Sequence, residues 1–377
     1  MLAFGLAIFN TLYATQALLP TLTSELGVSP STAALTVSAA TGALALCVVP
    51  ASILSEKFGR GHVLVISALA ATGIGLVLPL AQSAEQLIAL RALQGAMIAG
   101  TPAVAMTWLS EELDERDLPG AMGLYIAGNT IGGLTGRLIP AGLLEVTTWR
   151  WALLGSGVVA FGLALLAAWL LPEQRNFTPK LSIRPRSEIA AMGRHLHNPR
   201  LLALYATAFV AMGVFVSMYN YFGFRAVLDF GLPAALSGLV YVVYLSGTWS
   251  SARAGALLKR HGHGVVVLMS SILMLAGALG VASSSLWVTL AGLLVFTASF
   301  FALHSTASGW VGLIAERDRA EASSMYVFSY YMGSSILGAG TGWAYESLPW
   351  AGFIGVLALL LSALTVVAAA LWRGAQH

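Results

Sequence analysis

Residues 52–64 read SILSEKFGRGHVL, a short charged loop between two long apolar segments. A second loop of the same kind, KRHGHG, occupies residues 259–264 and also follows an apolar segment. Gly59 and Gly262 take equivalent places in the two loops, 203 residues apart. Because glycine permits a tight turn between two helices, both loops are predicted to join neighbouring helices. The repeat indicates that the chain consists of two related halves.

The composition is that of a membrane protein. Of the 377 residues, 58% are apolar and only 9% are charged, whereas soluble domains carry about 25% charged residues. The apolar segments are long and continuous, which favours helices over a β-barrel. We therefore predict an all-α integral membrane protein. This composition excludes a soluble enzyme and a nucleic-acid-binding protein, and the net charge of +3 is too small to indicate affinity for nucleic acid.

The apolar segments predict twelve transmembrane helices, since each needs about 20 residues to cross a bilayer. The predicted spans are residues 2–22, 32–54, 63–82, 87–109, 119–144, 150–171, 200–228, 235–258, 265–282, 286–314, 321–343 and 350–371. One long polar stretch separates the sixth span from the seventh. We expect two pseudo-symmetric six-helix bundles, residues 1–171 and 200–377, joined by a cytoplasmic linker at 172–199. An internal repeat of six spans is typical of transporters whose substrate lies between the halves.

The distribution of basic residues predicts the orientation. Lysine and arginine are concentrated in alternate loops, in the central linker and in the C-terminal tail, and they are nearly absent from the opposite loops. Since cytoplasmic loops carry the excess of positive charge, both termini are expected in the cytoplasm. The expected location is a bacterial-type cytoplasmic (inner) membrane. The single cysteine, Cys47, excludes an internal disulfide.

The loop at residues 52–64 resembles the conserved loop between spans 2 and 3 of the major facilitator superfamily, Gly-x-Leu-x-Asp-Arg-x-Gly-Arg-Arg. Leu54, Gly59 and Arg60 match this pattern, and Glu56 replaces its aspartate. The resemblance implies a cytoplasmic gate. The expected gating residues are Glu56, Gly59, Arg60, Glu111 and Glu112, because the two glutamates that end span 4 can pair with Arg60. The alternative is a basic loop without a gating role.

Two further motifs resemble the same superfamily. RALQG, from Arg91 to Gly95, resembles its Arg-x-x-Gln-Gly motif, and an arginine within a span indicates a function because it is costly there. The alternative for Arg91 is a side chain that extends outward towards Glu85. GNTIGGLTG, from Gly128 to Gly136, resembles the glycine-rich signature of antiporters, with Gly133 in place of the usual proline. Close helix packing explains the same glycines equally well.

Five longer blocks, in both halves, resemble the YnfM-like, or acriflavine-sensitivity, branch of the superfamily. They read LYIAGNTIGGLTGRLIP, WRWAL, SGTWSSARAG, FFALHSTASGWVG and ASSMYVFSYYMGSS. The resemblance implies a proton-coupled exporter of small amphipathic compounds that works by alternating access. It does not carry over a particular substrate.

In this superfamily the central cavity is lined mainly by spans 1, 4, 7 and 10, with 2, 5, 8 and 11 beside them. Polar and aromatic residues on these spans are the candidate substrate-binding residues: Asn10, Tyr13, Gln16, Arg91, Gln94, Tyr125, Asn129, Tyr219, Asn220, Tyr241, Tyr244, Phe301, His304 and Tyr331. Aromatic walls suit planar or amphipathic guests. Arg91, Arg137 and Arg225, three cations within spans, favour an anionic or zwitterionic guest. The alternative is that many of these rings only pack against neighbours.

No aspartate or glutamate lies deep within a predicted span. His304 is the only histidine inside a span, and histidine titrates near neutral pH. The proton-coupling candidates are therefore His304 and Arg91. The alternative for His304 is a hydrogen-bonded packing residue.

The leading hypothesis is a secondary active antiporter without enzymatic activity. The chain lacks a phosphate-binding loop, so ATP is not expected to drive it. Two alternatives remain open, a proton-coupled importer or facilitator of a small metabolite and, less favoured, a polytopic membrane enzyme. The expected partners are a small-molecule substrate, protons and membrane lipids. No cofactor, metal or nucleic acid is expected, and the protein is expected to act as a monomer.

Overall fold

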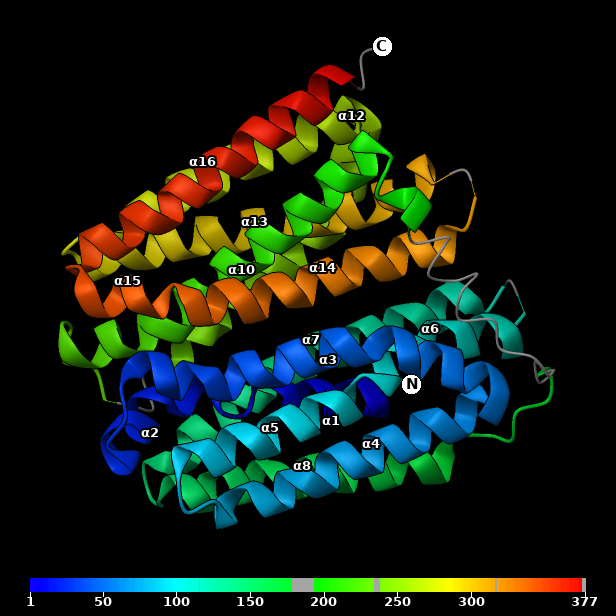
Figure 1. Ribbon diagram of the computed structural model, residues 1–377, viewed down its shortest axis with the longest axis horizontal. Coiled ribbons are helices and arrows are strands. Elements are labelled where there is room, and N and C mark those ends of the chain that lie inside the picture. Colours follow the sequence, from blue (N-terminus) through cyan, green and yellow to red (C-terminus); the bar gives the residue numbers. More distant parts are fainter. Residues whose placement is uncertain (115, 178–192, 234–237, 316, 375–377) are drawn as a thin grey trace. The chain divides into compact units, whose positions relative to one another are not determined.

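The computed structural model describes residues 1–114, 116–177, 193–233, 238–315 and 317–374. Every regular element in these residues is a helix (Figure 1). The chain forms two compact units. Unit 1 consists of Met1–Pro185 and Gly223–Leu239, and unit 2 consists of Arg186–Phe222 and Val240–His377. The central part of the predicted linker, residues 178–192, lies outside the described residues.

Unit 1 contains ten helices among its described residues, together with the end of α10. They are α1 (Leu2–Tyr13), η1 (Gln16–Leu18), α2 (Leu19–Leu26), α3 (Pro30–Phe58), α4 (Arg60–Val77), η2 (Leu78–Leu80), α5 (Ala84–Ile98), α6 (Gly100–Glu112), α7 (Leu118–Leu144) and α8 (Trp149–Leu170). Polar caps explain two of the boundaries. The Ser29 hydroxyl accepts a hydrogen bond from the Thr32 amide, and the Ser83 hydroxyl accepts one from the Gln86 amide. Each bond satisfies a free N–H at the start of a helix.

Unit 2 contains most of α10 and the helices that follow it. They are α10 (Pro199–Leu228), η3 (Val240–Val243), α12 (Tyr244–Val281), α13 (Leu286–Ile314), α14 (Arg319–Gly340), α15 (Gly342–Ser347) and α16 (Trp350–Gly374). Gly262 interrupts α12 with φ 78° and ψ 165°, so α12 is two helical segments joined at a sharp bend. Gly59, between α3 and α4, also has a positive φ, of 97°. The two glycines that the repeat made equivalent therefore form the same kind of turn in each unit.

The helices have the length and surface of membrane spans. In the described part of the chain, nine helical stretches are long and apolar enough to cross a membrane, and one of them, Val240–Val281, contains the bend at Gly262. The long helices α7 and α14 are additional to these nine. The all-α membrane fold is therefore confirmed, while the count of twelve spans stays a prediction.

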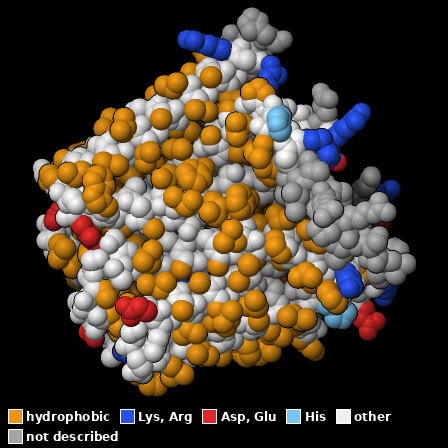
Figure 2. Space-filling view, viewed as in Figure 1, with side chains coloured by type: hydrophobic (Ala, Val, Ile, Leu, Met, Phe, Trp, Pro, Cys, Tyr) orange, Lys and Arg blue, Asp and Glu red, His pale blue; other side chains and the backbone are white. Residues whose placement is uncertain are grey.

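The surface supports the same conclusion. Hydrophobic side chains cover most of the face shown in Figure 2, and charged side chains lie near the ends of the helices. Trp169 and Trp287 expose 81% and 80% of their surface. A soluble protein would bury such side chains, whereas a lipid-facing helix can expose them.

Glycines bring two helices of each unit into backbone contact. In unit 1, a Cβ added at Gly128, Gly132 or Gly136 of α7 would come within 3.0 Å of backbone atoms of α1. In unit 2, a Cβ at Gly333 of α14 would come equally close to the backbone of Phe209 in α10. Small residues at such contacts allow helices to pack closely in a membrane. The glycine-rich motif of α7 thus has a packing role in the structure.

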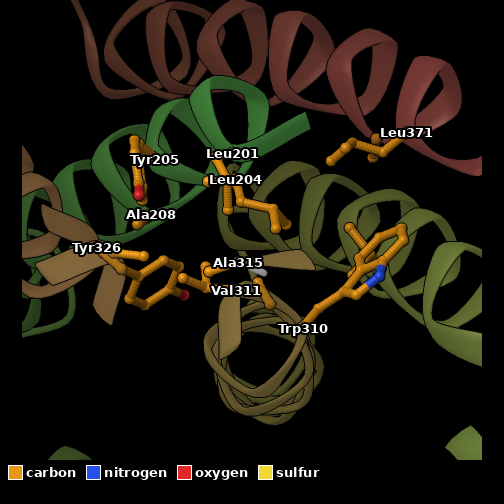
Figure 3. Close-up of a cluster of buried hydrophobic side chains, with 13 residues drawn as sticks. Leu201, Leu204, Tyr205, Ala208, Trp310, Val311, Ala315, Tyr326 and Leu371 are labelled. Carbon is orange, nitrogen blue, oxygen red and sulfur yellow. The ribbon is translucent and has the colours of Figure 1, made fainter. Parts of the chain in front are cut away.

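The core of unit 2 joins α10, α12, α13, α14 and α16. Leu204 and Tyr205 of α10 and Val311 of α13 are buried there, and Leu371 of α16 and Tyr326 of α14 belong to the same cluster (Figure 3). Tyr326 of this cluster is hydrogen-bonded to His304. The cluster therefore packs next to the part of the candidate site that contains His304.

Candidate substrate site and gate

Arg91 of α5 is completely buried in unit 1. Its guanidinium donates to the carbonyl oxygens of Thr11 (2.9 Å) and Leu12 in α1, and to that of Thr36 in α3 (2.8 Å). It also donates to Oε1 of Gln94 at 2.5 Å. Thr11 and Leu12 lie in the last turn of α1, whose terminal carbonyls have no partner within the helix. Arg91 therefore stabilises the point at which α1 ends, and it does not extend outward towards Glu85.

Asn10 connects three helices of unit 1. Its amide nitrogen donates to the Thr135 hydroxyl of α7 at 3.3 Å, and its Oδ1 accepts from the Ser156 hydroxyl of α8 at 2.9 Å. Gln94 donates to the Ala71 carbonyl of α4 at 2.9 Å. Asn10, Gln94 and Ser156 also line a small cavity within unit 1. The sequence-predicted Asn10 and Gln94 therefore line the same small cavity.

Arg137 of α7 forms a second buried cationic centre in unit 1. Its Nε donates to Oε1 of Gln16 at 2.7 Å, and its Nη1 donates to the Gly133 carbonyl at 2.6 Å. The guanidinium lies 3.9 Å from the ring centroid of Tyr13, a favourable cation–π geometry. The structure thus brings the predicted residues Tyr13 and Gln16 together around Arg137.

Tyr125 and Asn129 occupy successive turns of α7 in unit 1. Tyr125 is buried and Asn129 is half-buried. A Cβ at Gly5 would lie 2.6 Å from Oδ1 of Asn129, so Asn129 packs against α1. Both residues therefore lie at or near the contact between α1 and α7.

Unit 2 contains a cluster of aromatic side chains from α10, η3, α12 and α13. Phe215 of α10 stacks on Phe300 of α13, with ring centroids 3.9 Å apart, and it contacts Tyr219 at 5.0 Å and Tyr244 at 5.3 Å. Tyr219 stacks on Tyr241 at 5.5 Å and shares a 2.6 Å hydrogen bond with the Thr297 hydroxyl. Phe301 lies 6.0 Å from Tyr244. The predicted rings at 219, 241, 244 and 301 thus form one continuous cluster.

His304 lies at one end of this cluster. Its ring is 4.5 Å from Tyr330, 5.7 Å from Tyr326 and 6.0 Å from Phe300. Nδ1 of His304 is 3.1 Å from the Tyr326 hydroxyl, which also donates to the His304 carbonyl at 3.3 Å. Tyr331, which is buried, contacts Tyr330 edge-on at 5.1 Å. The histidine is therefore a titratable group set among aromatic rings.

Asn220 and Arg225 lie farther along α10. Asn220 is buried in the turn next to Tyr219. Arg225 lies 3.5 Å from the carboxylate of Asp229, one turn on, and 5.0 Å from the ring of Phe230. Arg225 therefore has an acidic partner at the end of its own helix.

The charged loop of unit 1 forms a compact polar cluster with the end of α6. Arg60 makes a salt bridge of 3.1 Å with Glu111, donates to the Ser55 hydroxyl at 2.6 Å and lies 3.9 Å from Glu56. Gly59 is buried at the turn. Glu112 instead accepts from the backbone amides of Arg175 and Asn176. All of these contacts lie within unit 1, and they include residues of the linker.

Several residues of these clusters were not among the predicted site residues. Ser156 and Thr135 are hydrogen-bonded to Asn10, and Phe215 lies at the centre of the aromatic cluster. Arg253, in the block SGTWSSARAG, is exposed on α12 with its guanidinium 5.0 Å from the ring of Trp249. Arg253 lies outside these clusters, and its charge inside an apolar span is visible in the sequence.

The helical fold, the buried cations and the aromatic cluster define a polytopic membrane transporter. Residues 1–253 match the model of the Major Facilitator Superfamily, and the chain belongs to this family. Over 370 residues it is 40% identical to the Inner membrane transport protein YnfM of Escherichia coli (strain K12), covering 98% of this chain and 88% of that protein. It is 35% identical to the Uncharacterized MFS-type transporter YybF of Bacillus subtilis (strain 168), covering 95% and 90%. The YnfM-like branch predicted from the sequence is thus confirmed.

Solved structures confirm the fold. The crystal structure of a mutant of the nucleoside transporter NupG superposes with a TM-score of 0.81 at 15% identity, covering 99% of this chain and 100% of that chain. Because the chain belongs to the Major Facilitator Superfamily and is similar to an inner membrane transport protein, it is a multi-pass inner-membrane secondary transporter of small molecules. Because the family and the relatives are transporters, it is not an enzyme.

Proposed function

We propose that the protein is a proton-coupled antiporter that exports small amphipathic compounds by alternating access. The observation that carries the proposal is His304, a titratable side chain at the end of a cluster of aromatic rings. Rings of this kind bind planar and amphipathic molecules, and the imidazole of a histidine can take up and release a proton. Proton binding and substrate binding would then occur on the same surface of unit 2.

The hydrogen bonds of His304 support a role in proton transfer. The Tyr326 hydroxyl donates to the His304 carbonyl, so its oxygen can accept from Nδ1. In that arrangement Nε2 is the nitrogen that takes up a proton. The new charge would lie 4.5 Å from the ring centroid of Tyr330 and 6.0 Å from that of Phe300, within the range over which an aromatic ring can attract a cation.

The buried arginines of unit 1 bear on the class of substrate. Arg137 and Tyr13 combine a cation with an aromatic ring, and Gln16 adds an amide. This combination favours guests with an anionic or zwitterionic group and a planar apolar part. Arg91 contributes by holding the end of α1, the helix that also carries Tyr13. We propose that the substrate-binding residues are the fourteen predicted from the sequence.

We also propose that the protein acts as a monomer and that both of its termini lie in the cytoplasm.

The test is transport by the purified protein in proteoliposomes with an imposed pH gradient. The panel contains acriflavine as a planar cation, benzoate as an aromatic anion and a zwitterionic aromatic amino acid. We expect gradient-driven movement of at least one compound out of the compartment that corresponds to the cytoplasm. Movement that ignores the gradient contradicts proton coupling. A panel in which only permanent cations move contradicts the role given to the arginines.

The histidine is tested by His304→Ala, with His261→Ala as the control. His261 is exposed, and its Nδ1 lies 3.3 Å from the carbonyl oxygen of Leu257 one turn earlier. We expect His304→Ala to abolish gradient-driven movement while substrate binding largely survives, and His261→Ala to behave like the unchanged protein. An unchanged pH dependence in His304→Ala removes this residue from the mechanism.

The alternative on the same fold is an importer or facilitator of a small metabolite. Cells that express the protein distinguish the two directions. An exporter lowers the accumulation of a transported dye, and its inactive His304→Ala variant restores it. An importer raises the accumulation of its substrate, and this result would replace export by import in the proposal.

A further inference from the structure

The first residues of the central linker are bound to the charged loop of unit 1. The Gly61 amide donates to Oε1 of Gln174 at 3.1 Å, and Nε2 of Gln174 donates to Oε2 of Glu111 at 3.3 Å. Gln174 therefore bridges the turn after Gly59 and the end of α6. The side chain uses its acceptor on one side and its donor on the other, so neither a glutamate, which has no donor when ionised, nor a lysine, which has no acceptor, can make both bonds.

Gln174 also controls how Glu111 faces Arg60. The Arg60 guanidinium approaches Oε1 of Glu111 most closely, with contacts of 3.1 Å and 3.2 Å. The bond from Gln174 goes to Oε2, which also accepts from Nε of Arg60 at 3.4 Å. Gln174 therefore adds a third contact to a carboxylate that Arg60 already holds at both oxygens, and it restricts the orientation of the Arg60–Glu111 salt bridge further.

Glu112 holds the next two linker residues. Its carboxylate accepts from the backbone amides of Arg175 at 3.0 Å and Asn176 at 2.9 Å. The Asn176 side chain donates in turn to the Glu111 carbonyl at 3.0 Å. Hydrogen bonds to a charged acceptor are stronger than neutral ones, so the backbone of the linker is fixed at the end of α6.

The described residues at the other end of the linker are bound in a similar place in unit 2. Arg194 makes a salt bridge of 2.6 Å with Asp318, and Nε2 of His195 lies 3.0 Å from the Asp318 carbonyl. Asp318 lies in the connection between α13 and α14. The repeat makes this connection equivalent to the loop between α6 and α7. Each end of the linker is thus bound beside the equivalent connection of its own unit, at the end of α6 in unit 1 and at the start of α14 in unit 2.

We propose that Gln174 and Glu112 are positioning residues of the gate, which bind the start of the linker and hold Arg60 and Glu111 in the orientation needed for turnover. The inference rests on the transport function and gate proposed above. Neither residue has to touch the substrate. Their loss is therefore expected to slow the conformational cycle without weakening substrate binding.

The experiment compares Gln174→Ala with Glu173→Ala in the full-length protein. Glu173 is the exposed neighbour of Gln174 and serves as the matched control. Hydrogen–deuterium exchange of residues 173–177 reports how firmly the start of the linker is anchored to unit 1, and it needs no substrate. Transport in proteoliposomes reports the maximal rate and KM. For Gln174→Ala we expect exchange to rise at least tenfold and the maximal rate to fall five- to tenfold, with KM within twofold.

The double variant Gln174→Glu, Glu111→Gln tests the pairing itself. Gln174→Glu alone places two carboxylates against each other and should raise the exchange as much as Gln174→Ala does. Adding Glu111→Gln provides an amide donor at position 111 opposite the carboxylate at position 174. At least half of the protection against hydrogen–deuterium exchange should then return. Gln174→Glu replaces Gln174→Ala in all measurements if the alanine variant does not fold.

Equal exchange in the Gln174 and Glu173 variants overturns the anchor. Raised exchange with an unchanged maximal rate overturns the positioning role, and so does a rate loss accompanied by a large rise in KM. Failure of the unchanged protein to transport any compound of the panel refutes the proposed function instead. In that case the exchange measurements still decide whether Gln174 holds the linker.

Discussion

The two units have related backbones and different interiors. Unit 1 buries cations and amides, with Arg91 and Arg137 bonded to backbone carbonyls and to glutamine side chains. Unit 2 places rings in the comparable region, centred on Phe215. At the offset of 203 residues, Gln16 corresponds to Tyr219 and Gln94 to Thr297. Gln16 accepts from an arginine, whereas Tyr219 and Thr297 bond to each other.

The backbone contacts, in contrast, are shared. Both units turn at a glycine with positive φ, and both bring a glycine-containing helix against the first helix of the unit. The comparison teaches that both units pack a glycine-containing helix closely against their first helix, while the side chains in their interiors differ. Unit 1 should therefore depend on polar contacts for stability, and unit 2 on ring packing.

The largest expected effect is that of Arg91→Ala. The substitution leaves four buried oxygen atoms without this donor, and each unsatisfied buried group costs about 1–3 kcal/mol. After partial relaxation we expect the free energy of unfolding to fall by about 3–5 kcal/mol. Thermal unfolding of the purified protein in detergent measures the change.

Arg91→Lys is the companion variant. Lysine keeps the charge and has no planar fork, so it cannot reach carbonyls of α1 and α3 together. It should restore less than half of the lost stability. A change below about 1 kcal/mol for Arg91→Ala would contradict the view that unit 1 depends on this residue.

The next effect concerns the shared glycine contacts. Gly136→Ala adds a methyl group against the Asn10 backbone, whereas Gly142→Ala, in the same helix, meets nothing within 4 Å. Overpacking costs about 1–3 kcal/mol, so only Gly136→Ala should lower the unfolding temperature. In unit 2, Gly333→Ala and Gly340→Ala form the equivalent pair. Equal effects within either pair would contradict the shared packing.

Much of the fold could be predicted from the sequence because it rests on periodic or local signals. Long apolar segments predicted the helices, and the loop around Gly59 predicted both the turn and its partner at Gly262. The salt bridge between Arg60 and Glu111 also followed from charges placed at the ends of neighbouring spans. These features depend on residue type and spacing, which a sequence displays directly.

The partners of buried polar groups could not be predicted in this way. Arg91 binds carbonyl oxygens of α1 and α3, and every residue carries such an oxygen, so the sequence contains no signal for the choice. Phe215 lies in an apolar segment where any ring can face lipid or protein. The contact of Gln174 with Gly61 joins residues far apart in the chain through a backbone amide. Only the packing of the helices determines these partners.

A smaller effect tests whether unit 2 also uses polar contacts. Tyr219→Phe keeps the ring and removes the hydroxyl that bonds to Thr297 at 2.6 Å. One hydrogen bond contributes about 0.5–1.5 kcal/mol. A double-mutant cycle with Thr297→Val should give a coupling energy of about 1 kcal/mol. A coupling above about 3 kcal/mol would mean that unit 2 relies on polar contacts as unit 1 does.

The smallest effect is expected at the end of the linker in unit 2. The salt bridge between Arg194 and Asp318 is short, but 63% of the arginine side chain and 34% of the aspartate side chain are exposed. Water and salt compete with such a pair, so its coupling energy should be about 0.2–1 kcal/mol. The cycle uses Arg194→Ala and Asp318→Asn, since Asp318 has φ 52° and asparagine tolerates this conformation.

The free energy of unfolding is then measured at low and at high salt, and the coupling should vanish at high salt. The anchor of the linker in unit 1 should behave differently, because Glu112 binds backbone amides and Gln174 is uncharged. Its exchange protection should therefore depend only weakly on salt. A coupling above about 1 kcal/mol between Arg194 and Asp318 that persists at high salt would show that both ends of the linker are held with similar strength.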